Sequence, residues 1–72
     1  MDTYRAFILD GKDRILRAEV LSAKTDEAAM AEARPLWEEA NIEIWRGSRR
    51  VARVLKGGIV QPPKNGGGPN GQ

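Results

Sequence analysis

The apolar residues of this chain gather in short runs, and residues typical of turns and helix ends separate these runs. The first two runs span residues 4–9 and 15–21 and are rich in branched or aromatic side chains. Asp10-Gly11-Lys12-Asp13 lies between them and favours a turn, because glycine tolerates positive φ and aspartate bonds to its own backbone. The pattern therefore predicts a β-hairpin.

The register of this hairpin decides which of its faces belongs to the core. An even-length loop places Phe7 and Leu9 beside the apolar face of the second strand, whereas an odd-length loop places Ala6 and Ile8 there. We favour the even loop, because Phe7 and Leu9 bring more apolar area. The apolar face of the second strand consists of Leu16, Ala18 and Val20. The opposite face of the hairpin then carries a second apolar set: Tyr4, Ile8, Ile15 and Leu21.

A helix is predicted after Thr25, whose hydroxyl can cap an otherwise unpaired backbone N–H. Asp26 and Glu27 follow, where the helix dipole favours negative charge. Apolar residues then recur at helical spacing: Ala29, Ala33, Leu36, Trp37 and Ala40. Pro35 deletes a backbone hydrogen bond and clashes with the preceding turn, so we expect a kink over residues 31–35 or a break into two short helices. Asn41 should end the helix as a left-handed cap.

A second hairpin is predicted after the helix, with strands at residues 42–45 and 51–55. Arg46-Gly47-Ser48-Arg49 forms its tight turn, with glycine at the position that needs an unusual backbone conformation. Ile42 and Ile44 should face the helix.

This element order, β-β-α-β-β, predicts an α+β fold in which a four-stranded, mostly antiparallel sheet carries one helix on one face. The loop length leaves open whether Val51 or Ala52 joins the core. Residues 1–56 would form a single small domain. From residue 57 the chain is rich in Gly, Pro and Asn and cannot bury enough surface to offset its ordering entropy. Residues 57–72 are therefore predicted to be a disordered tail.

The residue types that are missing exclude several classes of chemistry. The chain has 72 residues and contains neither cysteine nor histidine. This composition rules out disulfides, thiol nucleophiles, histidine acid–base catalysis and the usual transition-metal ligands. We predict a protein that is not an enzyme and has no cofactor. Apolar runs of only three or four residues are too short for a membrane span, so a cytoplasmic location is expected.

The charges are distributed unevenly along the chain. Residues 1–44 hold six basic and ten acidic residues, whereas residues 45–56 hold five basic residues and no acid. A hairpin of this kind can contact nucleic acid or an acidic partner, because arginines contact phosphates and an aromatic ring stacks on bases. The candidate contacts are Trp45, Arg46, Arg49, Arg50 and Arg53. The alternative is that these charges protect a sheet edge against stray pairing.

The function that we favour is based on a different surface, the second apolar face of the first hairpin. This face, if exposed, would be a patch of the kind that marks partner surfaces, and a two-fold dimer could bury it. The candidate interface residues are Tyr4, Ile8, Ile15 and Leu21. We therefore predict a non-enzymatic protein-interaction module that can self-associate, with weak nucleic-acid binding through residues 45–56 as the alternative.

The chain also resembles a known family over residues 4–55. Tyr4-Arg5-Ala6-Phe7 at the start and the Trp-x-Gly-x-Arg hairpin at residues 45–49 are similar to a family of very small alphaproteobacterial proteins of unknown function, common in rhizobia. Pro35 and the long C-terminal segment depart from the family pattern. The resemblance implies the β-β-α-β-β fold and a bacterial origin, but it implies no activity and no functional residue.

Overall fold

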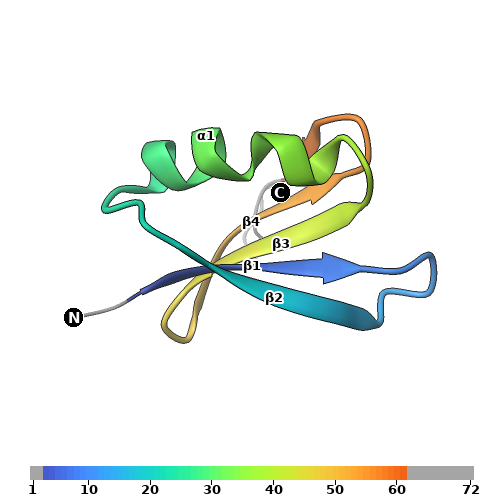
Figure 1. Cartoon of the computed structure of the whole chain (residues 1–72), viewed down its shortest axis with the longest axis horizontal. Coiled ribbons are helices and arrows are strands. Elements are labelled where there is room, and N and C mark those ends of the chain that lie inside the picture. Colours follow the sequence, from blue (N-terminus) through green and yellow to red (C-terminus); the bar gives the residue numbers. More distant parts are fainter. Residues whose placement is uncertain (1–2, 62–72) are drawn as a thin grey trace, which may run out of the picture.

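The computed structural model describes residues 3–61, which form one sheet and one helix (Figure 1). In chain order the elements are β1 Tyr4–Leu9, β2 Ile15–Leu21, α1 Asp26–Trp37, β3 Asn41–Arg46, β4 Arg49–Leu55 and β5 Ile59–Gln61. The sheet is antiparallel throughout, in the order β2-β1-β3-β4-β5. This confirms the α+β class and the antiparallel sheet, but the sheet has five strands instead of the four predicted.

The fifth strand follows a tight reversal after β4. Gly57 and Gly58 adopt φ values of 94° and 100°, a region that L side chains rarely enter. The Gly57 N–H donates to the Trp37 carbonyl at 2.8 Å, and the Gly58 N–H donates to the Leu55 carbonyl at 2.9 Å. Of the segment predicted as a tail, residues 57–61 therefore belong to this turn and to β5, while residues 62–72 lie outside the described residues.

The core lies between α1 and one face of the sheet. The strands contribute Tyr4, Ala6, Ile8, Leu21, Ile42, Ile44, Ala52 and Val54, and the helix contributes Ala29, Ala33 and Trp37. All of these residues are at most 8% exposed. Ile42 and Ile44 face the helix as predicted. Of the two β4 residues left open by the sequence, Ala52 pairs with Ile44 and joins the core, while Val51 is half-buried and packs against the core.

The face assignment of the first hairpin is wrong, except that Leu9, predicted with Phe7 as a core residue, is 4% exposed and follows a register shift after Ile8. Phe7 does share a face with Ala18, as the favoured register requires, but α1 covers the opposite face. The reason is the pairing of β1 with β3, in which Ala6 lies across from Ile44 and Ile8 across from Ile42. Since partners in a ladder share a face, the helix-facing isoleucines of β3 draw the even-numbered residues of β1 into the core.

α1 begins as predicted, but its end differs from the prediction. The Thr25 hydroxyl accepts a hydrogen bond from the Ala28 N–H at 3.1 Å. The helix then runs through Pro35 without a break and ends at the C-cap Glu38. Asn41 is the first residue of β3, so it is not a helix cap. Its side-chain oxygen accepts a hydrogen bond from the Lys56 N–H at 2.8 Å and ties β3 to the end of β4.

Candidate interaction surfaces

The residues predicted as an interface are mostly buried beneath the helix. Tyr4, Ile8 and Leu21 are 2%, 6% and 5% exposed, whereas Ile15 is 61% exposed. Three of the four therefore form core contacts and present no surface to a partner, because the pairing of β1 with β3 turns this face of the hairpin toward the helix. Of this set, only Ile15 remains available on the surface.

The tip of the basic hairpin is tied to the start of the helix. The Arg49 Nη2 atom lies 3.3 Å from Asp26 Oδ1, which also accepts a 2.6 Å hydrogen bond from the Tyr4 hydroxyl. The bond from Tyr4, assisted by Arg49, holds the pKa of Asp26 below its usual value, and the same bond raises the pKa of Tyr4. The Arg46 guanidinium lies 5.6 Å from the centre of the Tyr4 ring, a cation–π contact.

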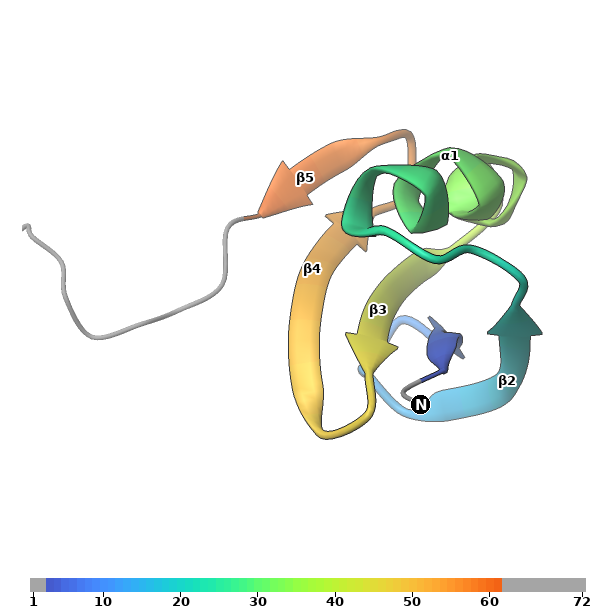
Figure 2. The same cartoon turned by 90° about the vertical axis from the view of Figure 1, so that its left-hand side faces the viewer.

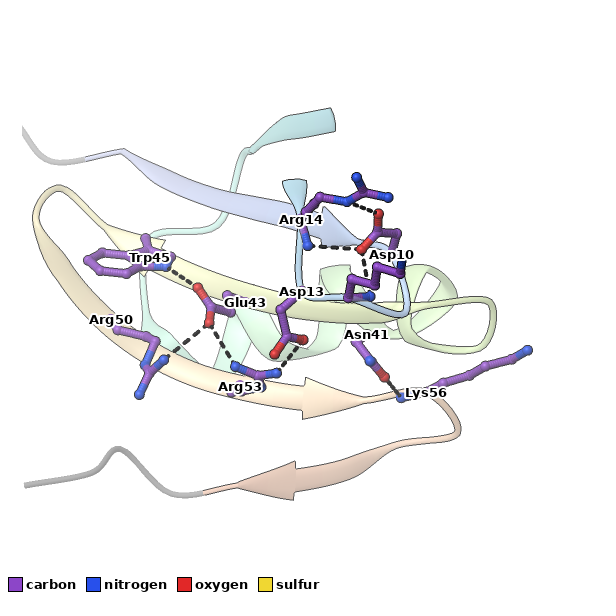
Figure 3. Close-up of polar contacts among 10 residues, drawn as sticks. Asp10, Asp13, Arg14, Asn41, Glu43, Trp45, Arg50, Arg53 and Lys56 are labelled. Carbon is purple, nitrogen blue, oxygen red and sulfur yellow. Dashed lines mark hydrogen bonds and ion pairs between the residues drawn. The ribbon is translucent and has the colours of Figure 1, made fainter. Parts of the chain in front are cut away.

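Glu43 holds the next part of the hairpin (Figure 3). Its carboxylate accepts hydrogen bonds from Trp45 Nε1 at 3.1 Å, from Arg50 Nη1 at 3.1 Å and from Arg53 Nη1 at 3.4 Å. A bulge makes this possible. The register between β3 and β4 shifts after Ile44, so that Arg53 faces Glu43 and Arg50 faces Trp45 on one side of the sheet.

Arg53 also reaches the first hairpin. Its Nη2 atom lies 2.6 Å from Asp13 Oδ1 in the β1–β2 turn, and this bond raises the pKa of Arg53. Asp13 adopts φ 64°, and Asp10 stabilises the turn by accepting hydrogen bonds from the N–H groups of Lys12 and Arg14. The turn thus presents a carboxylate to β4.

These contacts change the interpretation of the basic segment. Arg49, Arg50 and Arg53 each pair with a carboxylate of the same chain, which lowers the positive potential that a phosphate would meet. β3 is an inner strand, but β5 pairs only with Arg53, Val54 and Leu55 of β4. Within residues 3–61 no strand covers the part of β4 that carries Arg49 and Arg50, so the alternative that these arginines protect a sheet edge stays a prediction. Glu43, which organises the cluster, was not predicted as part of it, although its place two residues before Trp45 on the same strand was the available signal.

Aromatic residues occupy the sheet face that α1 leaves open. The Phe7 and Trp45 rings meet edge to face with centroids 6.4 Å apart. A shallow hollow of about 290 Å³ lies beside them, lined by Phe7, Ile15, Glu43, Trp45, Gly47 and Ser48. Trp45, predicted as a stacking residue, is half-buried here, and its indole N–H is used by Glu43.

The outer strand β2 is the most exposed apolar element. Ile15, Leu16 and Val20 are 61%, 63% and 66% exposed, and among the strands of residues 3–61 only β1 pairs with β2. The backbone N–H and C=O groups on its outer side therefore have no neighbouring strand, and such an open edge is the usual template for strand addition. Leu16 and Val20 were predicted to be core residues. No local signal marks them as surface, because the edge position of β2 follows from the long-range pairing of β1 with β3.

The opposite edge offers less to a partner. Figure 2 shows β5 at the far end of the curled sheet from β2. β5 has three residues, of which Ile59 and Val60 are 62% and 50% exposed. Pro62 follows in the sequence and has no backbone N–H to donate. Short edge strands limit further pairing, so β2 is the more capable edge.

Comparison of the chain with protein-family models, with curated proteins and with solved structures gave no match. The resemblance of residues 4–55 to the alphaproteobacterial family therefore stays a prediction. Within residues 3–61, no helix is long and apolar enough to cross a membrane. The same part of the chain contains no cluster of three or more carboxylates that could hold a metal ion.

Proposed function

We propose that this chain is a non-enzymatic protein-interaction module that binds an extended strand of a partner protein along β2. The observation that carries the proposal is the combination of an open seven-residue edge with exposed Ile15, Leu16 and Val20. In strand addition, main-chain hydrogen bonds supply affinity and side chains beside the edge supply specificity.

The rest of the molecule supports this assignment. The sheet is anchored by a packed core, so the edge is presented by a rigid element and a binder need not order it first. The candidate nucleic-acid residues are largely engaged with carboxylates of the same chain, whereas Ile15, Leu16 and Val20 of β2 are more than 60% exposed.

The absence of cysteine from the sequence provides a direct test. Val20→Cys creates a single thiol that can carry a benzophenone photo-crosslinker, and Glu27→Cys places the same probe on the exposed helix as a matched control. We expect discrete adducts in cell extract from position 20 and none of them from position 27. The captured protein is then purified, and its affinity is measured against the unmodified chain.

The affinity measurement decides the proposal. Leu16→Lys and Val20→Lys change exposed side chains on the edge, and each should weaken binding by about ten-fold or more, because an added charge would meet the apolar contact. Glu27→Lys should leave binding unchanged. Equal adducts from both probe positions, or full affinity in both lysine variants, would show that β2 is not the binding edge.

A further inference from the structure

The sequence of β2 is complementary to itself. The strand reads Ile15-Leu16-Arg17-Ala18-Glu19-Val20-Leu21, with Ala18 at its centre. If two copies pair antiparallel about a two-fold axis through Ala18, Arg17 lies across from the partner's Glu19, and Glu19 across from the partner's Arg17. Leu16 then lies across from the partner's Val20. Opposite charges and apolar residues that face each other across a ladder both stabilise a sheet.

Neighbouring registers lack this complementarity. A two-fold axis perpendicular to the sheet keeps each residue opposite one of the same face, so the next registers are centred on Arg17 or on Glu19. The first places Arg17 across from the partner's Arg17, and the second places Glu19 across from the partner's Glu19. Like charges directly opposite each other destabilise the pairing. The Ala18 register is therefore the one that the charges select.

The structure leaves this edge accessible. Arg17 and Glu19 lie on the same face of β2 and form a 3.0 Å ion pair, with side chains 62% and 42% exposed. α1 packs chiefly on β3. Between α1 and β2 lies an open hollow of about 390 Å³, whose lining includes Leu16, Arg17, Pro35 and Leu36. The helix therefore does not cover the outer side of β2.

From this geometry we infer that the strand bound by β2 is the β2 strand of a second copy of this chain. The two sheets would join through their β2 edges into one continuous sheet, with both helices on the same side. Each Arg17–Glu19 ion pair would extend into a four-charge cluster across the two-fold axis. This inference rests on the proposed function and adds the identity and register of the partner.

Complementation between charge-reversed chains tests whether the partner is a second copy, and the weakening expected in each single variant tests the register. The full chain and three variants, Arg17→Glu, Glu19→Arg and Lys56→Glu, are studied by sedimentation velocity from about 10 μM to about 1 mM. The unmodified chain should show a concentration-dependent dimer. Arg17→Glu and Glu19→Arg should each weaken dimerisation by about ten-fold or more, because each places like charges opposite one another. Lys56→Glu, at the far end of the sheet, should dimerise normally.

The deciding sample is an equimolar mixture of the Arg17→Glu and Glu19→Arg chains. In the Ala18 register every charge again meets its opposite, so the mixture should dimerise at least as well as the unmodified chain. An unmodified chain that stays monomeric up to about 1 mM, or a mixture that fails to associate, overturns the inference. In either case β2-dependent binding of another captured protein, weakened by Leu16→Lys and Val20→Lys, would still support the interaction module.

Discussion

Glu43 offsets part of the positive charge of the basic hairpin at residues 45–56, and Glu43→Gln tests this role. The carboxylate accepts hydrogen bonds from Trp45, Arg50 and Arg53. Glutamine has nearly the same shape and keeps one acceptor oxygen, but it removes the charge and places an NH₂ group near two guanidinium groups. The variant should therefore weaken the cluster without leaving a cavity.

The magnitude follows from the exposure of the groups. The Glu43 side chain is 18% exposed, and those of Arg53 and Arg50 are 24% and 31% exposed. A fully exposed ion pair contributes about 0–1 kcal/mol, whereas a hydrogen bond to a charged group contributes about 1.5–3 kcal/mol. These half-buried contacts lie between the two cases. We expect the free energy of unfolding to fall by about 1–2 kcal/mol, which lowers Tm by roughly 4–8 °C per kcal/mol in a domain of this size.

Urea unfolding followed by tryptophan fluorescence measures this loss, and Glu39→Gln is the matched control because it removes the same charge from an exposed helix-end residue. The control should change the free energy of unfolding by less than about 0.5 kcal/mol. A second assay measures binding to a labelled oligonucleotide at low salt. Only Glu43→Gln should gain salt-sensitive binding, because it releases Arg50 and leaves Arg53 held by Asp13 alone. If both variants behave alike in stability and in binding, Glu43 does not hold the arginines and the description of a neutralised hairpin fails.

Three further changes test other parts of the fold. Thr25→Ala removes the N-cap bond to the helix and should lower the free energy of unfolding in urea by about 1 kcal/mol. Thr25→Ser should retain most of the stability that this bond contributes. Gly58→Ala places a Cβ at φ 100°, 3.2 Å from Trp37 Nε1, and should cost about 1–2 kcal/mol, whereas Gly11→Ala, with open space around it, should stay within about 0.5 kcal/mol. Tyr4→Phe removes the bond that lowers the pKa of Asp26 and raises that of Tyr4. The free energy of unfolding of this variant should then fall less steeply below the ordinary aspartate pKa of 3.8 than that of the unmodified chain. It should also lack the loss above the ordinary tyrosine pKa of 10.0. Unchanged slopes of the free energy against pH would refute this coupling.

The elements themselves were predictable because their signals are local. The Thr25 cap and the helical stripe that follows it gave the start and the buried side of α1. Gly47, at φ 59°, marked the tight turn between β3 and β4. The break that was one of the two alternatives at Pro35 is wrong, because Pro35 lies on the exposed side of the last turn, where water can satisfy the freed carbonyl and where packing of Ala33 and Trp37 holds the helix in place.

The faces of the first hairpin were not predictable from its own sequence. Both faces carry large apolar residues, and the choice between them is made by the pairing of Ile8 with Ile42 and of Ala6 with Ile44, residues far apart in the chain. The same long-range pairing sends β2 to the edge and exposes Leu16 and Val20. β5 was missed for a related reason. Its three residues form a strand only because two glycines turn the chain back onto β4.

The segregation of charge along the sequence acquires a different meaning in the folded chain. Within residues 3–61, acidic residues before position 45 pair with basic residues after it: Asp13 with Arg53, Asp26 with Arg49, and Glu43 with both Arg50 and Arg53. The split of charge therefore pairs two halves of one domain and gives little evidence for an external polyanion. The ion pair on the outer edge differs, because Arg17 and Glu19 come from the same strand and draw no partner from the basic segment. The ion pairs between the two halves of the sequence help to hold the domain together. The Arg17–Glu19 pair on the open edge of β2 is self-complementary, so it can select a second molecule.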